Sequence, residues 1–271
     1  MTDQELNAYD GVVVNSSGGK DSQTALRYIA TRYTRPDQVW VSHQDLGEME
    51  WEGSRALAQV QADHYGLRFE VSRYRNQKGE ELSLLDYVLK RGKWMDNKNR
   101  YCTSDFKRGP GLRVVTMFAR WLRAEHGIEH PRILNVFGFR AEESPNRRKK
   151  PELEKNVRAW KRAKWYELFD YLPIQQWTEE QVWDDIRPSK VPYHLAYDLG
   201  MPRLSCVMCF YAPRGALVLA ARFNKPLFER YLKVEKATGH RFTDKLALAD
   251  IRDEVYSHKP IESSLTGAWN M

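Results

Sequence analysis

The chain has 271 residues, 42% of them hydrophobic, and a formal net charge of +7 at pH 7. This length is sufficient to bury a full hydrophobic core, and no apolar run reaches the roughly 20 residues that a membrane-spanning helix needs, so the composition predicts a soluble globular protein without a membrane partner. The acidic and polar start, MTDQELNAYD, is typical of neither a signal peptide nor a transit segment and indicates the cytoplasm.

The hydrophobic pattern predicts alternating strands and helices in the first half of the chain. A buried strand at 11–15 precedes a helix at 21–32 and a second strand at 38–42. The alternation continues with helices predicted at 51–65, 82–91 and 110–125 and strands at 67–72 and 133–139. Strands and helices at this spacing indicate a parallel sheet with crossover helices.

The periodicity weakens after Pro151, where prolines interrupt the chain repeatedly. In this part the pattern predicts helices at 179–186, 214–223 and 226–238. The expected architecture is an α/β fold with two parts. A doubly wound, Rossmann-like parallel sheet at 1–172 would bind nucleotide, and an irregular or helical extension at 173–271 would pack on it.

The segment SGGKDS, directly after the first predicted strand, has the composition of a phosphate-binding loop. Glycines adopt positive φ and have no Cβ to keep a phosphate away, while the start of a helix presents N–H groups to an anion. The serine hydroxyls donate hydrogen bonds, and the lysine adds a positive charge. The segment matches neither the Walker A spacing nor the dinucleotide pattern. We predict nucleotide binding by Ser17, Gly18, Gly19, Lys20, Asp21 and Ser22, with an ordinary strand-to-helix turn as the alternative.

Polar residues also follow two later strands. Ligands of open parallel sheets bind outside the carboxyl ends of the strands, which brings Asp45 near the loop, where its carboxylate would hold Mg²⁺ or a ribose. The strand at 133–139 opens at Gly138, which we expect to contribute to cofactor binding, and Arg140 and Arg147 follow it as candidate clamps for phosphate or sulfate oxygens. The alternatives are a turn aspartate and surface arginines.

The positive charge is concentrated between Arg140 and Lys164, where ten Lys or Arg residues stand against four Glu. Trp160, Trp165 and Tyr166 lie among these cations. A basic run with interleaved aromatic residues is typical of a nucleic-acid surface, so nucleic acid is a predicted partner. The alternative is a solvated surface whose aromatic rings turn to the core.

Three cysteines are too few for a disulfide framework in a chain of this length, and two of them form a Cys-x-x-Cys pair. Thiolates at this spacing suit an iron–sulfur cluster or zinc. We predict Cys102, Cys206 and Cys209 as metal ligands. Zinc completed by a histidine and three simple reduced thiols remain alternatives.

The order of several motifs resembles the phosphoadenosine phosphosulfate (PAPS) reductase family over about residues 10–212. The motifs are SGGKDS, DLGEME, CTSDFKRGP at 102–110, GFRAEES and the two segments LPIQQWTEEQVW and YDLGMPRLSCVMC. The resemblance implies an adenine nucleotide alpha hydrolase-like fold whose PP-loop binds ATP or an adenylyl sulfate. It covers sulfonucleotide reductases, sulfate adenylyltransferase subunits and sulfur-insertion enzymes.

Within that family, the cysteine pattern departs from the reductases that carry a [4Fe–4S] cluster. Those proteins pair a Cys-Cys with a later Cys-x-x-Cys, whereas Tyr101 stands at the first position here. The resemblance then implies a cluster with three cysteine ligands and one open iron, or no cluster. The family's thiol reductases also use a cysteine on a C-terminal tail, and no cysteine follows Cys209 in this sequence.

These departures favour the sulfur-insertion branch. The expected function is an ATP pyrophosphatase-type enzyme that adenylates its substrate and lets sulfur displace AMP, as in DNA phosphorothioation or tRNA thiolation. Lys20, Asp21 and Arg140 would be catalytic, Mg²⁺ would be held by Asp21 and Asp45, and a cysteine desulfurase would supply sulfur. The alternatives are a PAPS or adenylyl sulfate reductase and a nucleotide-binding subunit without catalysis.

Overall fold

The computed structural model describes residues 1–261 and 263–266, apart from the side chains of residues 160–162. The chain forms two compact units, each assembled from separate segments. Unit 1 comprises residues 1–45, 53–72 and 110–194, and unit 2 comprises residues 46–52, 73–109 and 195–271.

Unit 1 is built on a six-stranded sheet in the order β3-β2-β1-β4-β6-β5. Five strands run parallel, and the short edge strand β5 is antiparallel to β6. The strands are β1 (Gly11–Asn15), β2 (Val39–Gln44), β3 (Arg68–Ser72), β4 (Arg132–Phe137), β5 (Leu153–Lys155) and β6 (Glu167–Tyr171). The order reverses between β1 and β4, which is the position where open α/β sheets bind ligands.

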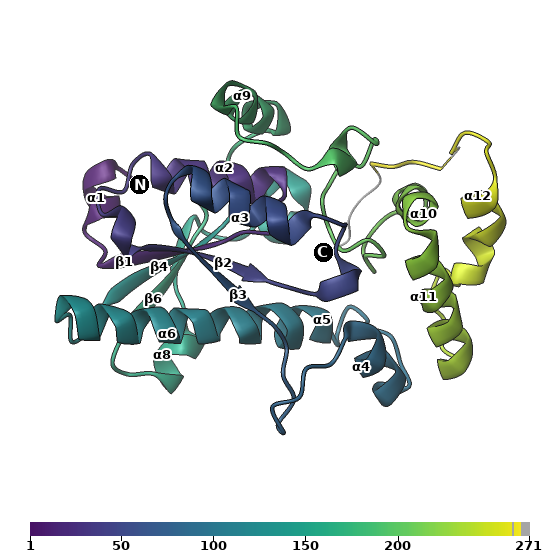
Figure 1. Cartoon of the computed structure of the whole chain (residues 1–271), viewed down its shortest axis with the longest axis horizontal. Coiled ribbons are helices and arrows are strands. Elements are labelled where there is room, and N and C mark those ends of the chain that lie inside the picture. Colours follow the sequence, from purple (N-terminus) through teal and green to yellow (C-terminus); the bar gives the residue numbers. More distant parts are fainter. Residues whose placement is uncertain (262, 267–271) are drawn as a thin grey trace. The chain divides into compact units, whose positions relative to one another are not determined.

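Helices cover both faces of this sheet (Figure 1). Val12 and Val14 of β1 pack with α2 residues, and Val13 packs on the opposite face with α6. This explains why β1 is an unbroken apolar run. The helices of unit 1 are α1 (Asp3–Asn7), α2 (Lys20–Ala30), α3 (Ser54–His64), α6 (Gly109–His126), α7 (Pro145–Arg148), α8 (Val157–Arg162) and α9 (Glu179–Ser189).

The predicted α/β fold with a parallel sheet is confirmed, and β5 and β6 are additions that the pattern did not predict. The sequence of β6, ELFDY, is short, and Asp170 interrupts its apolar residues. Its Asp170 is held between the side-chain amides of Asn135 and Asn156, at 2.8 and 3.0 Å. Burial raises the pKa of Asp170, against the effect of the two amide donors. A carboxylate inside a strand is tolerated because such partners satisfy it.

Unit 2 is helical and has its own apolar core, which includes Met49, Trp94, Phe106 and Tyr231. The Trp94 and Tyr231 rings stack with centroids 5.3 Å apart. Its helices are α4 (Leu84–Arg91), α5 (Tyr101–Thr103), α10 (Arg214–Phe223), α11 (Lys225–Thr238) and α12 (Arg252–Tyr256), and a π-helical turn spans Ser104–Arg108.

The two units do not follow the order of the chain. Residues 173–194, expected in the C-terminal extension, cluster with unit 1, and residues 73–109 cluster with unit 2. Compact units need not be independent domains, so the division at 172 and 173 stays a prediction. In the part of the chain that the structure describes, no helix has the length and apolar character needed to span a membrane.

Candidate functional site

The loop at 17–22 joins β1 to α2 and is closed by its own serine side chains. The Ser22 hydroxyl donates to the Gly19 carbonyl at 2.9 Å and accepts from the Ser17 N–H at 3.2 Å. Gly19 is the N-cap residue of α2, and no side chain of the described residues caps the start of this helix. An uncapped helix start leaves first-turn N–H groups for an anion.

Gly18 has both a backbone and a steric reason to be glycine. Its φ is +75°, and a Cβ at this position would lie 2.7 Å from the backbone oxygen of Ser54, the first residue of α3. The loop is therefore packed tightly against the start of α3.

Gly138 is required by packing. A Cβ there would lie 2.3 Å from the carbonyl oxygen of Asp21 and 2.7 Å from the backbone nitrogen of Ser22. The end of β4 thus lies directly against the first turn of α2. This close approach explains the glycine without a ligand, and the expected role of Gly138 in cofactor binding stays a prediction.

Arg140, expected as an anion clamp, is buried and faces carboxylates. Its guanidinium donates to the Asp21 carboxylate at 2.5 Å and also pairs with Glu142. Burial lowers the pKa of Arg140, but the neighbouring Asp21 and Glu142 outweigh that effect and raise it. Arg140 therefore anchors the loop through Asp21, which is part of the loop. The catalytic roles of Asp21 and Arg140 stay predictions.

Arg147 has a similar arrangement. It pairs with Glu143, which is itself buried, and its guanidinium lies 4.2 Å from the centre of the Phe139 ring. The two arginines expected to bind an anion are thus both engaged by carboxylates after β4. An anion at Arg147 has to compete with Glu143.

Lys20 does not project into solvent. Its side chain is 0% exposed, and its ammonium lies 3.2 Å from the Glu179 carboxylate at the start of α9 and 6.0 Å from the centre of the Trp183 ring. The sequence pattern predicted that this charge would lie on a phosphate. In the structure its partner is Glu179 of α9, a residue outside the predicted site.

The segment that follows α9 is held against α2 and α3 by buried polar side chains. The Gln23 amide donates to the Val191 carbonyl at 3.1 Å, and the Gln61 amide donates to the Pro192 carbonyl at 3.1 Å. The His194 ring is 3.3 Å from the Ser54 hydroxyl. Residues 179–194 therefore fix both helices that border the loop.

Asp45 directly follows β2, at the strand end where it was predicted, and the structure places it beside a cation. Its N–H donates to the Ser72 carbonyl at 2.9 Å, and its carboxylate lies 3.4 Å from the Arg55 guanidinium of α3. The carboxylate is nearly buried. Its expected role as a Mg²⁺ ligand stays a prediction.

The three cysteines all belong to unit 2 and gather against its apolar core. Cys102 lies in α5, and the Cys206 and Cys209 pair lies in the segment before α10. Each thiol interacts electrostatically with at least one other thiol, and the Lys107 ammonium interacts with all three. The three thiols thus lie near one another, but within the described residues their sulfur atoms are not all within 4.8 Å of one another, and their role as metal ligands stays a prediction. Lys107 stands close to Cys102 in the sequence as well.

Burial is the main influence on these thiols. It raises the pKa of Cys206 to about 11, with Lys107 acting in the opposite direction. Burial likewise raises the pKa of Cys102 and of Cys209. Without a metal, these thiols would be mostly protonated near neutral pH and therefore poor nucleophiles.

The basic run at 140–164 is divided by the fold. Arg140 and Arg147 are paired inside unit 1, and Lys155 pairs with Glu167. Exposed cations remain at Arg148, Lys149, Lys150, Arg158 and Lys164. Tyr166 is buried in the core under α6, so its expected place among nucleic-acid contacts is wrong. The side chains of Trp160 and its two successors lie outside the described residues.

Comparison with known proteins identifies relatives of this chain. Adenosine 5'-phosphosulfate reductase of Allochromatium vinosum is 27% identical over 213 residues, which cover 77% of this chain and 72% of that protein. The reductase of the same name from Staphylococcus haemolyticus is 30% identical over 74 residues, which cover 27% of this chain and 28% of that protein. These curated relatives are named as reductases, so the expected placement in a phosphorothioation branch finds no support.

Two solved structures also resemble the chain. The phosphate complex of PAPS reductase from Candida auris has a TM-score of 0.49 at 19% identity, covering 76% of this chain and 88% of that chain. The U34-tRNA thiolase NcsA from Methanococcus maripaludis, with its [4Fe–4S] cluster, has a TM-score of 0.34 at 11% identity, covering 93% and 74%.

A family model described as the phosphoadenosine phosphosulfate reductase domain matches residues 11–212. The matched segment begins at β1 and ends just after the Cys206 and Cys209 pair, so it contains the loop and all three cysteines. Because this match covers most of the 271 residues, the chain belongs to the phosphoadenosine phosphosulfate reductase domain family.

Proposed function

We propose that this protein is a sulfonucleotide reductase that acts on adenosine 5'-phosphosulfate. The observation that carries the proposal is the loop at 17–22, where the start of α2 lacks a side-chain cap at the switch point of the sheet. The N–H groups of the first turn of α2 would hold the phosphate of the nucleotide. The Arg140 pair with Asp21 and the close approach at Gly138 would keep the loop in the shape that this requires.

The proposed reaction needs a dithiol as reductant. One thiolate attacks the sulfur of the substrate, and the bond between sulfur and the bridging oxygen breaks, so AMP leaves with that oxygen. The second thiolate then attacks the first thiol's sulfur and releases sulfite, leaving a disulfide. The dithiol loses two electrons and two protons, and the sulfur is reduced from the sulfate to the sulfite level.

We propose that the attacking thiol comes from a partner such as thioredoxin. The three cysteines of this chain have raised pKa values caused by burial, which disfavours the thiolate that attack requires. Residues 210–271 contain no cysteine. An external dithiol supplies both the nucleophile and the electrons.

The cysteines suit a second task. Three thiols grouped beside the Lys107 ammonium fit an anionic iron–sulfur cluster, and we propose that Cys102, Cys206 and Cys209 hold a [4Fe–4S] cluster with one iron free of a cysteine ligand. Such a cluster supplies charge and an open coordination position when bound. Zinc on the same thiols is the alternative.

A second candidate function is adenylation followed by sulfur insertion, with ATP and Mg²⁺ at the same loop. It is favoured by the burial that raises the pKa of all three thiols, because this chemistry does not need one of them as the attacking thiolate. The two candidates differ in their products. Reduction yields sulfite and AMP, whereas adenylation yields pyrophosphate.

The experiment supplies the purified full chain with adenosine 5'-phosphosulfate plus thioredoxin, or with ATP and Mg²⁺, and measures sulfite and pyrophosphate. Gly18→Ala is expected to lose nucleotide binding, because its Cβ would meet the Ser54 backbone at 2.7 Å. Gly92→Ala is the matched control, since Gly92 also has a positive φ but nothing lies within 4 Å of its Cβ. Sulfite release that depends on Gly18 and not on Gly92 supports the proposal. Pyrophosphate without sulfite favours the second candidate.

A further inference from the structure

We propose that the α6 and α8 face of unit 1 binds the phosphate backbone of duplex nucleic acid. The surface, which we call the α6–α8 face, is defined by Arg120 on the exposed side of α6, Arg158 on α8 and Lys164 just after α8. All three side chains are exposed and belong to the same unit. None of them forms an ion pair with any residue that the structure describes.

Two contacts bring the segment after α8 against α6. The hydroxyl groups of Thr116 and Tyr166 are 3.3 Å apart, and the Arg123 guanidinium lies 5.4 Å from the centre of the Trp165 ring. Arg120 lies four residues after Thr116 and three before Arg123, so it shares their side of α6. Lys164 directly precedes Trp165, so Lys164 and Arg120 lie on two segments that these contacts join.

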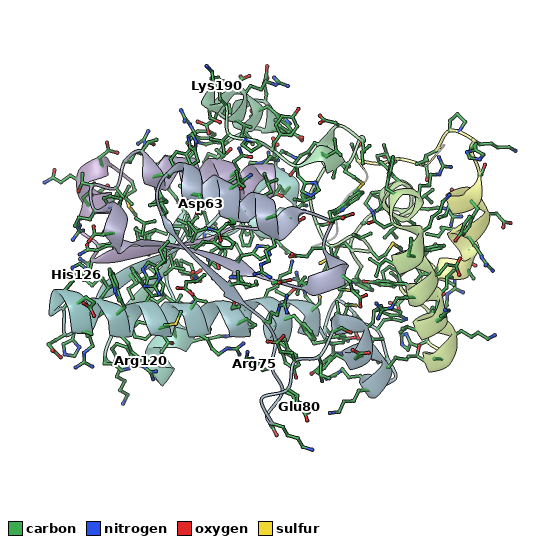
Figure 2. The ribbon with its side chains drawn as sticks, viewed as in Figure 1. Asp63, Arg75, Glu80, Arg120, His126 and Lys190 are labelled. Carbon is green, nitrogen blue, oxygen red and sulfur yellow. The ribbon has the colours of Figure 1, made fainter. Side chains whose placement is uncertain are left out.

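The helix itself is basic on its outer side. Its buried residues, including Val114, Phe118 and Leu122, face the sheet. Figure 2 shows the Arg120 side chain directed away from the sheet on the outer side of α6. Arg123, three residues after Arg120, pairs with Glu129 at 2.5 Å.

On the other face of the sheet, several cations are paired with carboxylates. There, on the side of α2 and α9, cations are matched with carboxylates in the pairs Lys20–Glu179, Arg27–Asp185, Arg32–Asp3 and Arg187–Asp184. The cations of these pairs are neutralised, whereas the three cations of the α6–α8 face form no ion pair with a described residue. A polyanion fits such a face, because each cation that meets a phosphate releases a condensed counterion.

Duplex nucleic acid is favoured over single strands by the state of the aromatic residues. Single-strand sites need rings on which bases stack, but Tyr166 is buried in the core and the Trp165 ring is engaged by Arg123. Among the described side chains of this face, the cations are therefore left without a free ring, and such cations recognise the backbone and not the base sequence. This binding is separate from the nucleotide loop and does not depend on the proposed reductase activity.

The test measures binding of the full chain to a short mixed-sequence DNA duplex and to an RNA duplex by fluorescence anisotropy over a range of salt concentrations. In Arg120→Gln/Lys164→Gln we expect the slope of log K against log salt to fall by about 2, which is about 1 per lost phosphate contact. Since each contact gives about 8-fold between 1 M and 0.1 M salt, the affinity at 0.1 M should fall roughly 60-fold.

Arg187→Gln/Lys190→Gln is the matched control. It also removes one arginine and one lysine from unit 1, but from α9 and its C-cap on the opposite face, where Lys190 is labelled (Figure 2). The control and the charge-preserving Arg120→Lys/Lys164→Arg should bind like the wild type. Equal losses in the two double variants, or wild-type binding that does not depend on salt, would overturn the proposal. Binding of single strands more tightly than duplex would overturn the choice of duplex.

Discussion

The close approach of β4 to the loop makes Gly138→Ala the most direct test of how the site is built. The added Cβ would lie 2.3 Å from the Asp21 carbonyl oxygen and 2.7 Å from the Ser22 nitrogen. Carbon and oxygen atoms in protein contacts rarely approach closer than about 3.3 Å, so β4 and the first turn of α2 must separate by about 1 Å. Both obstacles are backbone atoms and cannot rotate away.

The expected cost has two parts. Overpacking of this kind lowers the free energy of unfolding by about 1–3 kcal/mol. A displacement of about 1 Å in a binding loop is also enough to reduce catalysis by up to about 10²-fold. We expect Gly138→Ala to remain folded but to bind adenosine 5'-phosphosulfate and ATP much more weakly than the wild type.

Gly111→Ala is the control for this variant. Gly111 lies in α6, and its added Cβ would be 3.4 Å from the Gln44 side-chain amide, which can move. Alanine is favoured over glycine inside a helix by about 1 kcal/mol, which should offset the contact. Urea unfolding and calorimetric titration of the two variants give both quantities. If Gly138→Ala matched Gly111→Ala in stability and nucleotide affinity, the steric reasoning would be refuted.

Three further predictions concern other parts of the molecule. Glu179→Gln should lower the free energy of unfolding by about 1 kcal/mol, because it leaves the buried Lys20 ammonium without this carboxylate. In a double-mutant cycle by urea unfolding, the loss in Glu179→Gln/Lys20→Met should be smaller than the sum of the losses in the two single variants. Cys206→Ser should lower the iron and sulfide content of anaerobically purified protein well below wild type; zinc in place of iron would contradict the cluster. Glu235→Ala should cost about 2–3 kcal/mol, measured by urea unfolding, because its carboxylate accepts two backbone N–H groups at 2.7 and 3.0 Å.

The loop was predictable because its signal is local. A strand, two glycines and a helix start are adjacent in the sequence, and their backbone requirements are properties of the residues themselves. Gly18 is an example, since its positive φ is what the glycine indicated. The steric need for Gly138 was not predictable, because it depends on Asp21, far away in the sequence.

The main feature that could not be predicted from the sequence was which carboxylates pair with the charged residues of the site. Lys20 and Arg140 were expected on a ligand because they are cations near a phosphate loop. Their carboxylates come from α9 and from the loop and the turn after β4, and only the fold brings these together. The pattern also missed β6, because Asp170 interrupts its apolar residues and its amide partners lie on β4 and beyond β5.

The pairing of these charges bears on how the loop would accept a nucleotide. If Lys20 and Arg140 are neutralised by Glu179, Asp21 and Glu142, the loop itself adds little net positive charge. The attraction for a phosphate must then come mainly from the N–H groups and dipole at the start of α2, which act only over the first turn. Such a site favours a phosphate held close to the backbone, and the loop keeps its shape against α3 and β4 only with glycine at positions 18 and 138. Substitution of Gly18 or Gly138 by alanine should therefore lower nucleotide affinity more than a charge-removing substitution of Arg140 or Arg147.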